Sequence, residues 1–216
     1  MTLCRFGGIQ FVRCGMLAAA FVLAAAVFAQ GGGAPGNPSQ PRFRFAPDAV
    51  EPVIEYAEVQ EMLAAPDPAP LLRVYGDGRA HVHLPEYMKR AGDYELRLPP
   101  AELNTLIRSL AQDGIIDFDP VAVEQARQQA IAQQRASAGT LSAISDATET
   151  VITVRLDEYQ RGPAAAPILK LNKRFAWKNL EQDARRFPQS QALQRAAAGQ
   201  QRLRALLARP DLQKLP

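Results

Sequence analysis

The chain of 216 residues is close to charge balance, with 25 Lys or Arg and 22 Asp or Glu, which excludes a strongly basic or strongly acidic protein. Its only cysteines, Cys4 and Cys14, lie near the N-terminus. The chain from Gln30 onward therefore offers no disulfide, no thiolate metal site and no cysteine nucleophile. About 185 residues remain there, which is enough for one domain around a single core.

The first residues have the order of a secretory signal peptide. Arg5 and Arg13 supply positive charge, a thirteen-residue apolar run follows at 16–28, and small residues precede Gln30. We predict that 1–29 is a signal peptide cleaved after Ala29 and that the protein is exported, most simply to the periplasm. A spanning helix needs about 20 apolar residues, so we expect a membrane anchor only if the signal stays uncleaved.

Residues 30–50 are rich in Gly and Pro and have no apolar period, which predicts a flexible linker. Residues 51–216 are then expected to form a single domain. Its first element, at 53–59, is rich in β-branched residues and Tyr and is interpreted as a strand, with a helix through Val59, Met62 and Leu63 as the rival.

A hairpin is expected at 71–84, around Gly76-Asp77-Gly78. A three-residue turn pairs Leu72 with Val82 and separates polar from apolar residues, whereas a two-residue turn mixes them on both faces. Because a slip by one residue exchanges the faces, the cleaner separation is favoured. Gly78 is then predicted to be left-handed, in a type I turn with a G1 bulge. The polar face of this hairpin carries Arg73, Tyr75, Arg79, His81 and His83.

Strict alternation at 93–98 predicts the next strand, and a helix begins after it at Pro99-Pro100 and ends before Gly114. Residues 121–145 form a Gln/Ala-rich insertion, predicted as an exposed helix and then a loop. Two further strands are expected at 149–156 and 168–171. A basic C-terminal helix, 190–209, follows Ser190 as its cap, and Gly199 is expected to weaken it by about 1 kcal/mol relative to alanine.

The strands occur in runs and are joined by hairpins, which is typical of an α+β fold with antiparallel pairing. We expect one antiparallel sheet of about five or six strands with helices packed on one face.

Charge is distributed unevenly along the chain. Residues 30–160 contain 11 Lys or Arg against 19 Asp or Glu, whereas residues 161–216 contain 12 against 3. The basic segment either binds an anionic partner such as lipid phosphate or nucleic acid, or packs on the acidic body of the same chain. We favour the second interpretation, and expect no specific nucleic acid, because no aromatic residue is interleaved with the later arginines.

The sequence lacks the common signatures of nucleotide-binding loops, zinc proteases and nucleophile elbows. We therefore predict no catalytic residue and no cofactor. His81 and His83 alternate on a strand, so both imidazoles point the same way, and Glu86, Asp93 and Glu95 are near in sequence. A stable site needs three or four ligands, however, and the arginines predicted on the same face repel a cation, so we expect no metal.

Three segments, LLRVYGDGRAHVH, GDYELRLPPAELNTLIRSL and TETVITVRL, resemble small exported bacterial α+β domains of unknown function. Those domains open with a strand–Gly-Asp-Gly–strand hairpin, add a strand and a helix, and return with a second hairpin. The resemblance spans 71–171, and this chain departs from it by the 121–145 insertion and the basic C-terminal helix. It implies a periplasmic or surface domain and transfers no catalytic residue.

We expect a binding or accessory module rather than an enzyme, with another envelope protein as its partner. The polar hairpin face is the candidate surface, because Arg and Tyr are effective interface anchors. One version of this hypothesis is an inhibitor of an envelope protease. The alternatives from other classes are a hydrolase with dispersed carboxylates, and a structural envelope protein that contacts anionic lipid at a membrane surface through its basic C-terminus.

Overall fold

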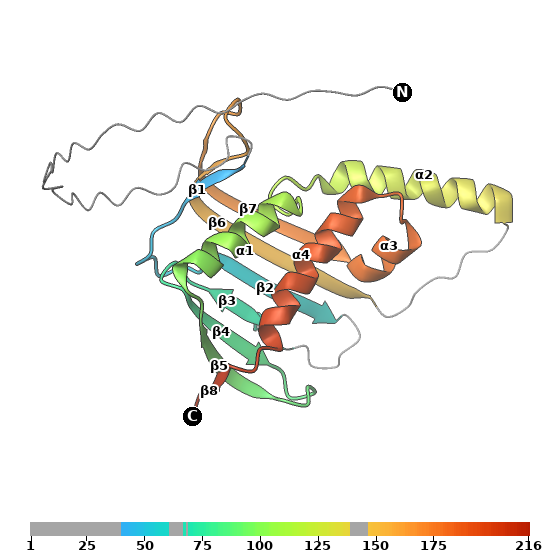
Figure 1. Cartoon of the computed structure of the whole chain (residues 1–216). Coiled ribbons are helices and arrows are strands. Elements are labelled where there is room, and N and C mark those ends of the chain that lie inside the picture. The colour runs from blue at the N-terminus through green and yellow to red at the C-terminus, as the bar shows by residue number, and fades with distance from the viewer. Residues whose placement is uncertain (1–39, 61–66, 68, 139–146) are drawn as a thin grey trace, which may run out of the picture. The chain divides into compact units, whose positions relative to one another are not determined.

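The computed structural model describes residues 40–60, 67, 69–138 and 147–216. In these residues the chain forms one antiparallel sheet of eight strands together with four helices, which confirms the α+β prediction (Figure 1). The strand count exceeds the predicted number because two short strands, β1 (Arg42–Arg44) and β8 (Gln213–Lys214), join the sheet. The predicted signal peptide at 1–29 and the loop at 139–146 lie outside the described residues.

The sheet runs in the order β7–β6–β2–β3–β4–β5–β8, and β1 pairs with the distal end of β6, on the same edge of β6 as β2. The longest pairing joins two neighbouring strands that are also consecutive in sequence, β6 and β7. The bounds of the six longer strands are β2 (Ile54–Gln60), β3 (Leu72–Val74), β4 (Arg79–Leu84), β5 (Gly92–Arg97), β6 (Thr148–Gln160) and β7 (Ile168–Lys178).

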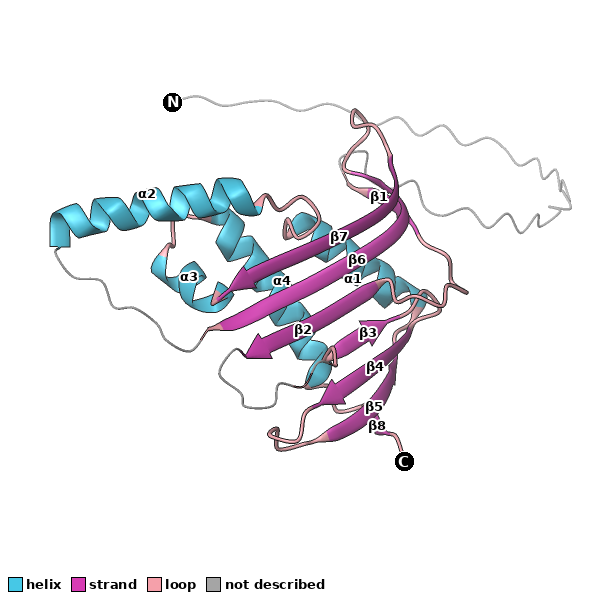
Figure 2. Cartoon of the chain, turned by 180° about the vertical axis from the view of Figure 1, so that it is seen from behind, coloured by secondary structure: helices cyan, strands magenta, loops and turns pink. Residues whose placement is uncertain are grey.

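Two helices, α1 (Pro100–Gln112) and α4 (Gln191–Leu207), lie across one face of the sheet. Figure 2 shows the opposite face without a covering helix among the described elements. The Gln/Ala-rich helix α2 (Pro120–Ala138) lies beside the β7 edge, and a short helix, α3 (Leu180–Arg186), precedes α4. The sheet therefore has one packed face and one open face, as an antiparallel sheet permits.

Alternation along the strands separates these two faces. Buried residues such as Ile54, Val82 and Ile152 point to the helices and meet apolar residues of α1 and α4, including Leu103 and Leu203. The intervening residues point to the open face and are polar in most strands. This pattern confirms the prediction that helices pack on one face of the sheet.

The β3–β4 hairpin has the predicted register. Leu72 pairs with Val82 and Val74 pairs with Ala80, and the amide of Gly78 donates to the carbonyl of Tyr75 at 3.0 Å. Gly78 has φ +85°, which is the left-handed conformation that the three-residue turn requires. The polar residues of the hairpin consequently all face away from the helices.

The fold begins earlier than the sequence predicted. Part of the expected 30–50 linker forms β1, which pairs with β6, and Phe43 and Phe45 pack against the core. Their rings stack with centroids 6.3 Å apart. A short strand with two aromatic anchors is thus hidden in a Gly/Pro-rich context, where composition favoured a flexible segment.

Some helix termini agree with the predictions from the sequence, and others differ from them. Asp119 caps α2, because its Oδ1 accepts from the amides of Val121 and Ala122 at 3.0 and 3.1 Å. Ser190 occupies the N-cap position of α4 but makes no side-chain cap bond, and α4 ends at Leu207, slightly earlier than expected.

Gly199 has a packing role that helix propensity alone does not predict. A Cβ at this position would lie 3.1 Å from Cγ1 of Ile115, and Ile115 is fully buried. The glycine lets α4 approach the segment that follows α1.

We expect Gly199→Ala to lower the free energy of unfolding by about 1 kcal/mol. The overpacking costs about 1–3 kcal/mol, which exceeds the gain of about 1 kcal/mol from the higher helix propensity of alanine. Urea denaturation measures the effect, and Ile115→Val should relieve part of it in the double variant. A Gly199→Ala variant more stable than the wild type would contradict this packing role.

Candidate functional site

The open face of the sheet carries a line of polar residues that crosses six strands. Successive register partners along this line are Arg174, Thr153, Glu55, Arg73, His81 and Glu95. Arg155 donates to Glu55 at 2.8 Å, and Arg73 lies 3.9 Å from the same carboxylate. Opposite charges on neighbouring strands stabilise such a face modestly and leave it hydrophilic.

All five residues predicted from the hairpin lie on this open face, and three of them contact one another. The rings of Tyr75 and His81 meet edge to face with centroids 5.4 Å apart, and the Arg79 guanidinium lies 5.6 Å from the Tyr75 centroid. We call Tyr75, Arg79 and His81 the Tyr75 cluster. Arg73 is the register partner of His81, whereas His83 lies further along β4 with other partners.

Two arginines face each other at the edge of the Tyr75 cluster. Arg79 lies directly opposite Arg97 in the β4–β5 pairing, and like charges at such positions are destabilising. Asp77 offsets part of the repulsion through an ion pair with Arg79 at 2.6 Å. A partner carboxylate near this end of the hairpin would relieve the remainder.

His83 is held between two carboxylates. Its Nδ1 lies 2.7 Å from Asp93 and its Nε2 lies 2.7 Å from Asp67. The hydrogen bonds to Asp93 and Asp67 raise the pKa of His83, and the bond from His83 lowers the pKa of Asp67. The two histidines therefore have different environments, since His81 contacts an aromatic ring and His83 joins β4, β5 and the segment that contains Asp67.

We expect His83 to titrate above 6.5, the ordinary value for histidine. A raised folded-state pKa stabilises the fold below 6.5, and this contribution is lost as the pH rises through the raised value. Asp93→Asn should lower the pKa of His83. Because the chain has only two histidines, NMR titration of their ring protons measures the pKa of His83 directly. An unchanged pKa of His83 in Asp93→Asn would exclude the contact between His83 and Asp93.

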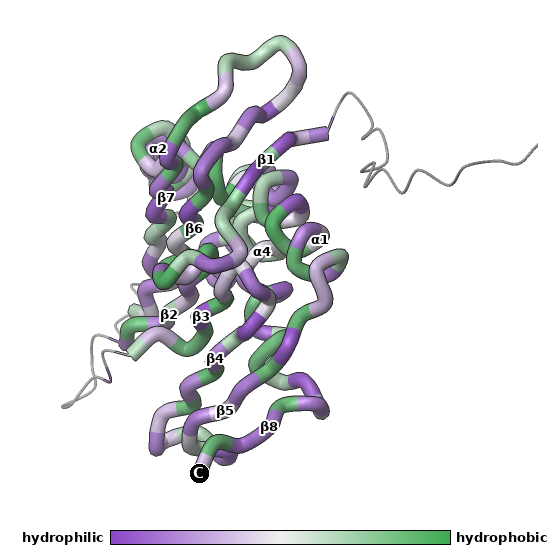
Figure 3. The backbone as a smooth tube through the Cα atoms, turned by 90° about the vertical axis from the view of Figure 1, so that its left-hand side faces the viewer, coloured by the Kyte–Doolittle hydropathy of each residue, from purple (hydrophilic) through white to green (hydrophobic). Residues whose placement is uncertain are grey.

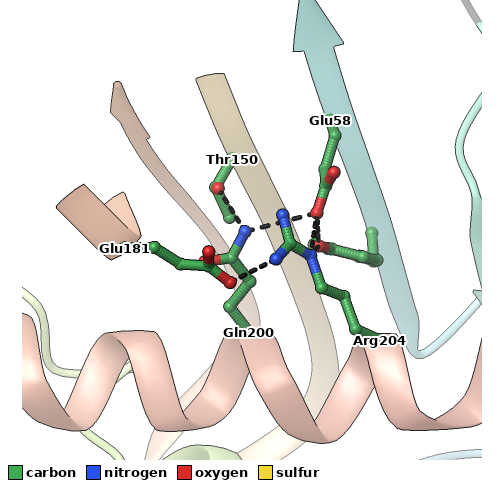
Figure 4. A network of polar contacts seen from close by, with 6 residues as sticks. Glu58, Thr150, Glu181, Gln200 and Arg204 are labelled. Atoms are coloured by element: carbon green, nitrogen blue, oxygen red, sulfur yellow. Dashed lines mark hydrogen bonds and ion pairs between the residues drawn. The ribbon is translucent and has the colours of Figure 1, made fainter. Parts of the chain in front are cut away.

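A second polar cluster lies under α4, on the packed face (Figure 4). Arg204 of α4 bridges Glu58 of β2 and Glu181 of α3, and Tyr56 donates to Glu58. Gln200, one helical turn before Arg204, donates to Thr150 at 2.9 Å and to Glu58 at 3.2 Å. We call these six residues the Arg204 network.

Burial determines the electrostatics of the Arg204 network. Burial and the Glu58 carboxylate raise the pKa of Tyr56 well above its ordinary value. Burial alone would raise the pKa of Glu58, but hydrogen bonds from Arg204 and Tyr56 outweigh it and lower that pKa. Glu58 is therefore a carboxylate at neutral pH, and its charge is neutralised by Arg204. No local sequence pattern predicted this network.

A groove of about 770 Å³ lies between α2, the end of β7 and α3. Its acidic residues include Glu124 and Asp183, and Arg127 lies between them, 2.8 Å from Glu124 and 3.8 Å from Asp183. Trp177 Nε1 also donates to Asp183 at 3.0 Å. These carboxylates are ion-paired or hydrogen-bonded within the chain, which does not favour an acid–base pair of the kind that a hydrolase needs.

Among residues 40–60, 67, 69–138 and 147–216, no group of three or more His, Cys, Asp or Glu is placed to hold a metal ion. No helix in that part of the chain is both long enough and apolar enough to cross a membrane.

The basic C-terminal segment packs on the acidic body of the same chain, as the favoured interpretation holds. Arg202 donates to Asp113 at 2.8 Å, and Arg204 pairs with Glu58. Arg209, which follows α4, pairs with Glu102 at the start of α1. The charge difference between the two parts of the sequence thus contributes to the contact between α4 and the rest of the domain.

The resemblance noted from the sequence rests on turn and core residues, which the structure places in the β3–β4 turn and under the helices. Residues of this kind specify a fold and carry no chemistry. No protein-family model, curated protein or solved structure matches this chain.

Proposed function

We propose that the protein is a non-catalytic binding module that engages a protein partner through the open face of its sheet, with the Tyr75 cluster as the anchor. The observation that carries the proposal is a polar sheet face that no described helix covers, with the Tyr75 ring in contact with Arg79 and His81 at one end. Tyr and Arg contribute most often to the energetic centres of protein interfaces.

The dimensions of the surface favour a protein over a small molecule. The hollow on this face, between Arg73, His83 and the C-terminal Pro216, has a volume of about 270 Å³. Pockets that enclose separate ligands have volumes of about 300–1,000 Å³. A hollow of this size accommodates a side chain of a partner, and the mixture of charges around it suits a polar protein surface.

The sequence pattern at 1–29 is the basis for proposing an exported protein, and an envelope protein is accordingly the proposed partner. An inhibitor of an envelope protease is one form of this module. The lipid-binding alternative through the C-terminus receives less support, because Arg204 and Arg209 are only 38% and 26% exposed and are paired with acidic residues of the body.

Photo-crosslinking tests the proposed surface. A photoreactive amino acid at Glu95, on the open face beside His81 of the Tyr75 cluster, should crosslink a specific envelope protein in cells. The same group at Thr105, which is exposed on α1 across the molecule, is the matched control and should not. Crosslinks to a partner from Thr105 and none from Glu95 would contradict the proposal.

A further inference from the structure

The β6–β7 hairpin forms an arm that extends beyond the main sheet. Its outer part, from Glu158 to Leu169, is paired only within the hairpin and with β1 (Figure 1). The arm bends at Lys170, which has φ +51°, and the register there skips the pair between Asp157 and Lys170. Tyr159 at the base of the arm is buried and donates to Asp117 at 3.2 Å, whereas residues 163, 164 and 166–170 beyond it are exposed.

The end of the arm is apolar and exposed. Ile168 and Leu169 are 49% and 67% exposed, and they are the only adjacent pair among the large exposed apolar residues of the described chain. We call the apolar tip the exposed residues Pro163, Ala164, Ala166, Pro167, Ile168 and Leu169. Exposed apolar residues gathered in one place mark contact sites for proteins or membranes.

Positive charges surround the arm just behind this tip. Arg42 and Arg44 come from β1, Arg161 begins the loop, and Lys170 marks the bend, and we call these four residues the basic collar. Arg44 pairs with Glu158 at 2.9 Å and Arg161 pairs with Asp117 at 2.6 Å, and both arginine side chains are exposed. Figure 3 shows the loop of the arm in pale to hydrophobic colours and the neighbouring β1 largely in hydrophilic ones.

We infer that this arm docks on the surface of an anionic lipid bilayer, with the apolar tip among the lipid headgroups and the basic collar against the phosphates. The order along the arm, apolar first and cationic behind, matches the order of the bilayer from its acyl boundary outward. A protein partner imposes no such order. Each cation near an anionic membrane contributes about a fivefold gain in binding, and ion pairs on exposed side chains exchange readily.

The position of the chain entry agrees with this orientation. The described chain begins at Gln40, immediately before Arg42 of the basic collar. Because β1 pairs with the outer end of β6, the described chain enters the domain at the end that carries the apolar tip. The open face of the sheet remains available for the proposed partner while the arm is docked.

Vesicle co-sedimentation tests the inference. The chain from Gln30 to Pro216 is suitable, because every core residue lies between Val53 and Leu206. We expect binding to vesicles that contain phosphatidylglycerol and at least tenfold weaker binding to pure phosphatidylcholine. The double variant Ile168→Ser with Leu169→Ser should reduce binding to the phosphatidylglycerol vesicles at least tenfold. Adding Arg42→Gln and Lys170→Gln should reduce binding further and make it less dependent on the salt concentration.

Val59→Ser with Tyr87→Ser is the matched control, because both residues are exposed and apolar and lie away from the arm. This variant should bind like the wild type, and thermal unfolding verifies that both serine variants are folded. Equal binding by the tip variant and the wild type would overturn the inference. A tip-dependent oligomer without vesicle binding would also overturn it, since the tip would then be a protein contact.

Discussion

Replacing Gly78 with alanine is expected to lower the free energy of unfolding by about 3 kcal/mol or more, from backbone strain of about 1–3 kcal/mol and a steric clash in addition. Gly78 has φ +85°, and a Cβ there would lie 2.3 Å from the carbonyl oxygen of Leu98. The carbonyl of Gly78 also accepts from the amide of Leu98 at 2.8 Å, so a backbone shift at the turn disturbs the start of α1.

Gly162→Ala is the matched control, because its Cβ would enter open space. It should change the free energy of unfolding by no more than about 0.5 kcal/mol. Urea denaturation at neutral pH measures both variants. A Gly78→Ala variant within about 1 kcal/mol of the wild type would show that the turn differs from the three-residue geometry.

Replacing Arg204 with alanine is expected to lower the free energy of unfolding by about 2–3 kcal/mol. Removal of one partner from a buried ion pair costs about 3–5 kcal/mol, and the partial exposure of Arg204 reduces this figure. The variant leaves Glu58 and Glu181 without their shared cation and removes a donor to the Tyr56 hydroxyl. Arg195→Ala, an exposed position on the same helix, is the control and should change stability by about 0.5 kcal/mol or less.

The loss caused by Arg204→Ala should shrink in acid. The pKa of Glu58 is lowered from 4.5 in the folded protein, so the charged network contributes stability above pH 4.5. This contribution is lost as the pH falls through the lowered value, because a protonated Glu58 no longer needs Arg204. Unfolding curves at pH 7 and pH 3 measure the difference. An equal loss of unfolding free energy at both pH values would show that the charge of Glu58 does not contribute to the effect of Arg204→Ala.

Local patterns were sufficient to predict the main elements of the fold. The alternation in the hairpin fixed both its register and its polar face, and the cap at Asp119 marked the start of α2. Strand β1 and helix α3 were not predicted, because three and seven residues are too few to show a period. Their stability comes from pairing with β6 and packing on α4 rather than from local preference.

Residues of the candidate sites were likewise predictable only where a local sequence pattern places them. The five hairpin residues share a face because of a period of two, whereas the Asp67 partner of His83 lies 16 positions away, in a segment without a pattern. The Arg204 network joins residues up to 148 positions apart, which no local pattern reveals. Two signals were present: Glu58 continues the inward series of Ile54 and Tyr56, and Gln200 precedes Arg204 by one helical turn.

The open face of the sheet is proposed to bind a protein partner. The most direct test of this proposal is the dissociation constant of the crosslinked partner for the wild type and for Tyr75→Ala with Arg79→Ala, measured by calorimetry. We expect a loss of affinity of about thirtyfold or more, as anchor residues worth about 2 kcal/mol or more imply. Lys89→Ala, exposed outside this face, should bind like the wild type. An unchanged dissociation constant in a folded double variant would contradict the claim.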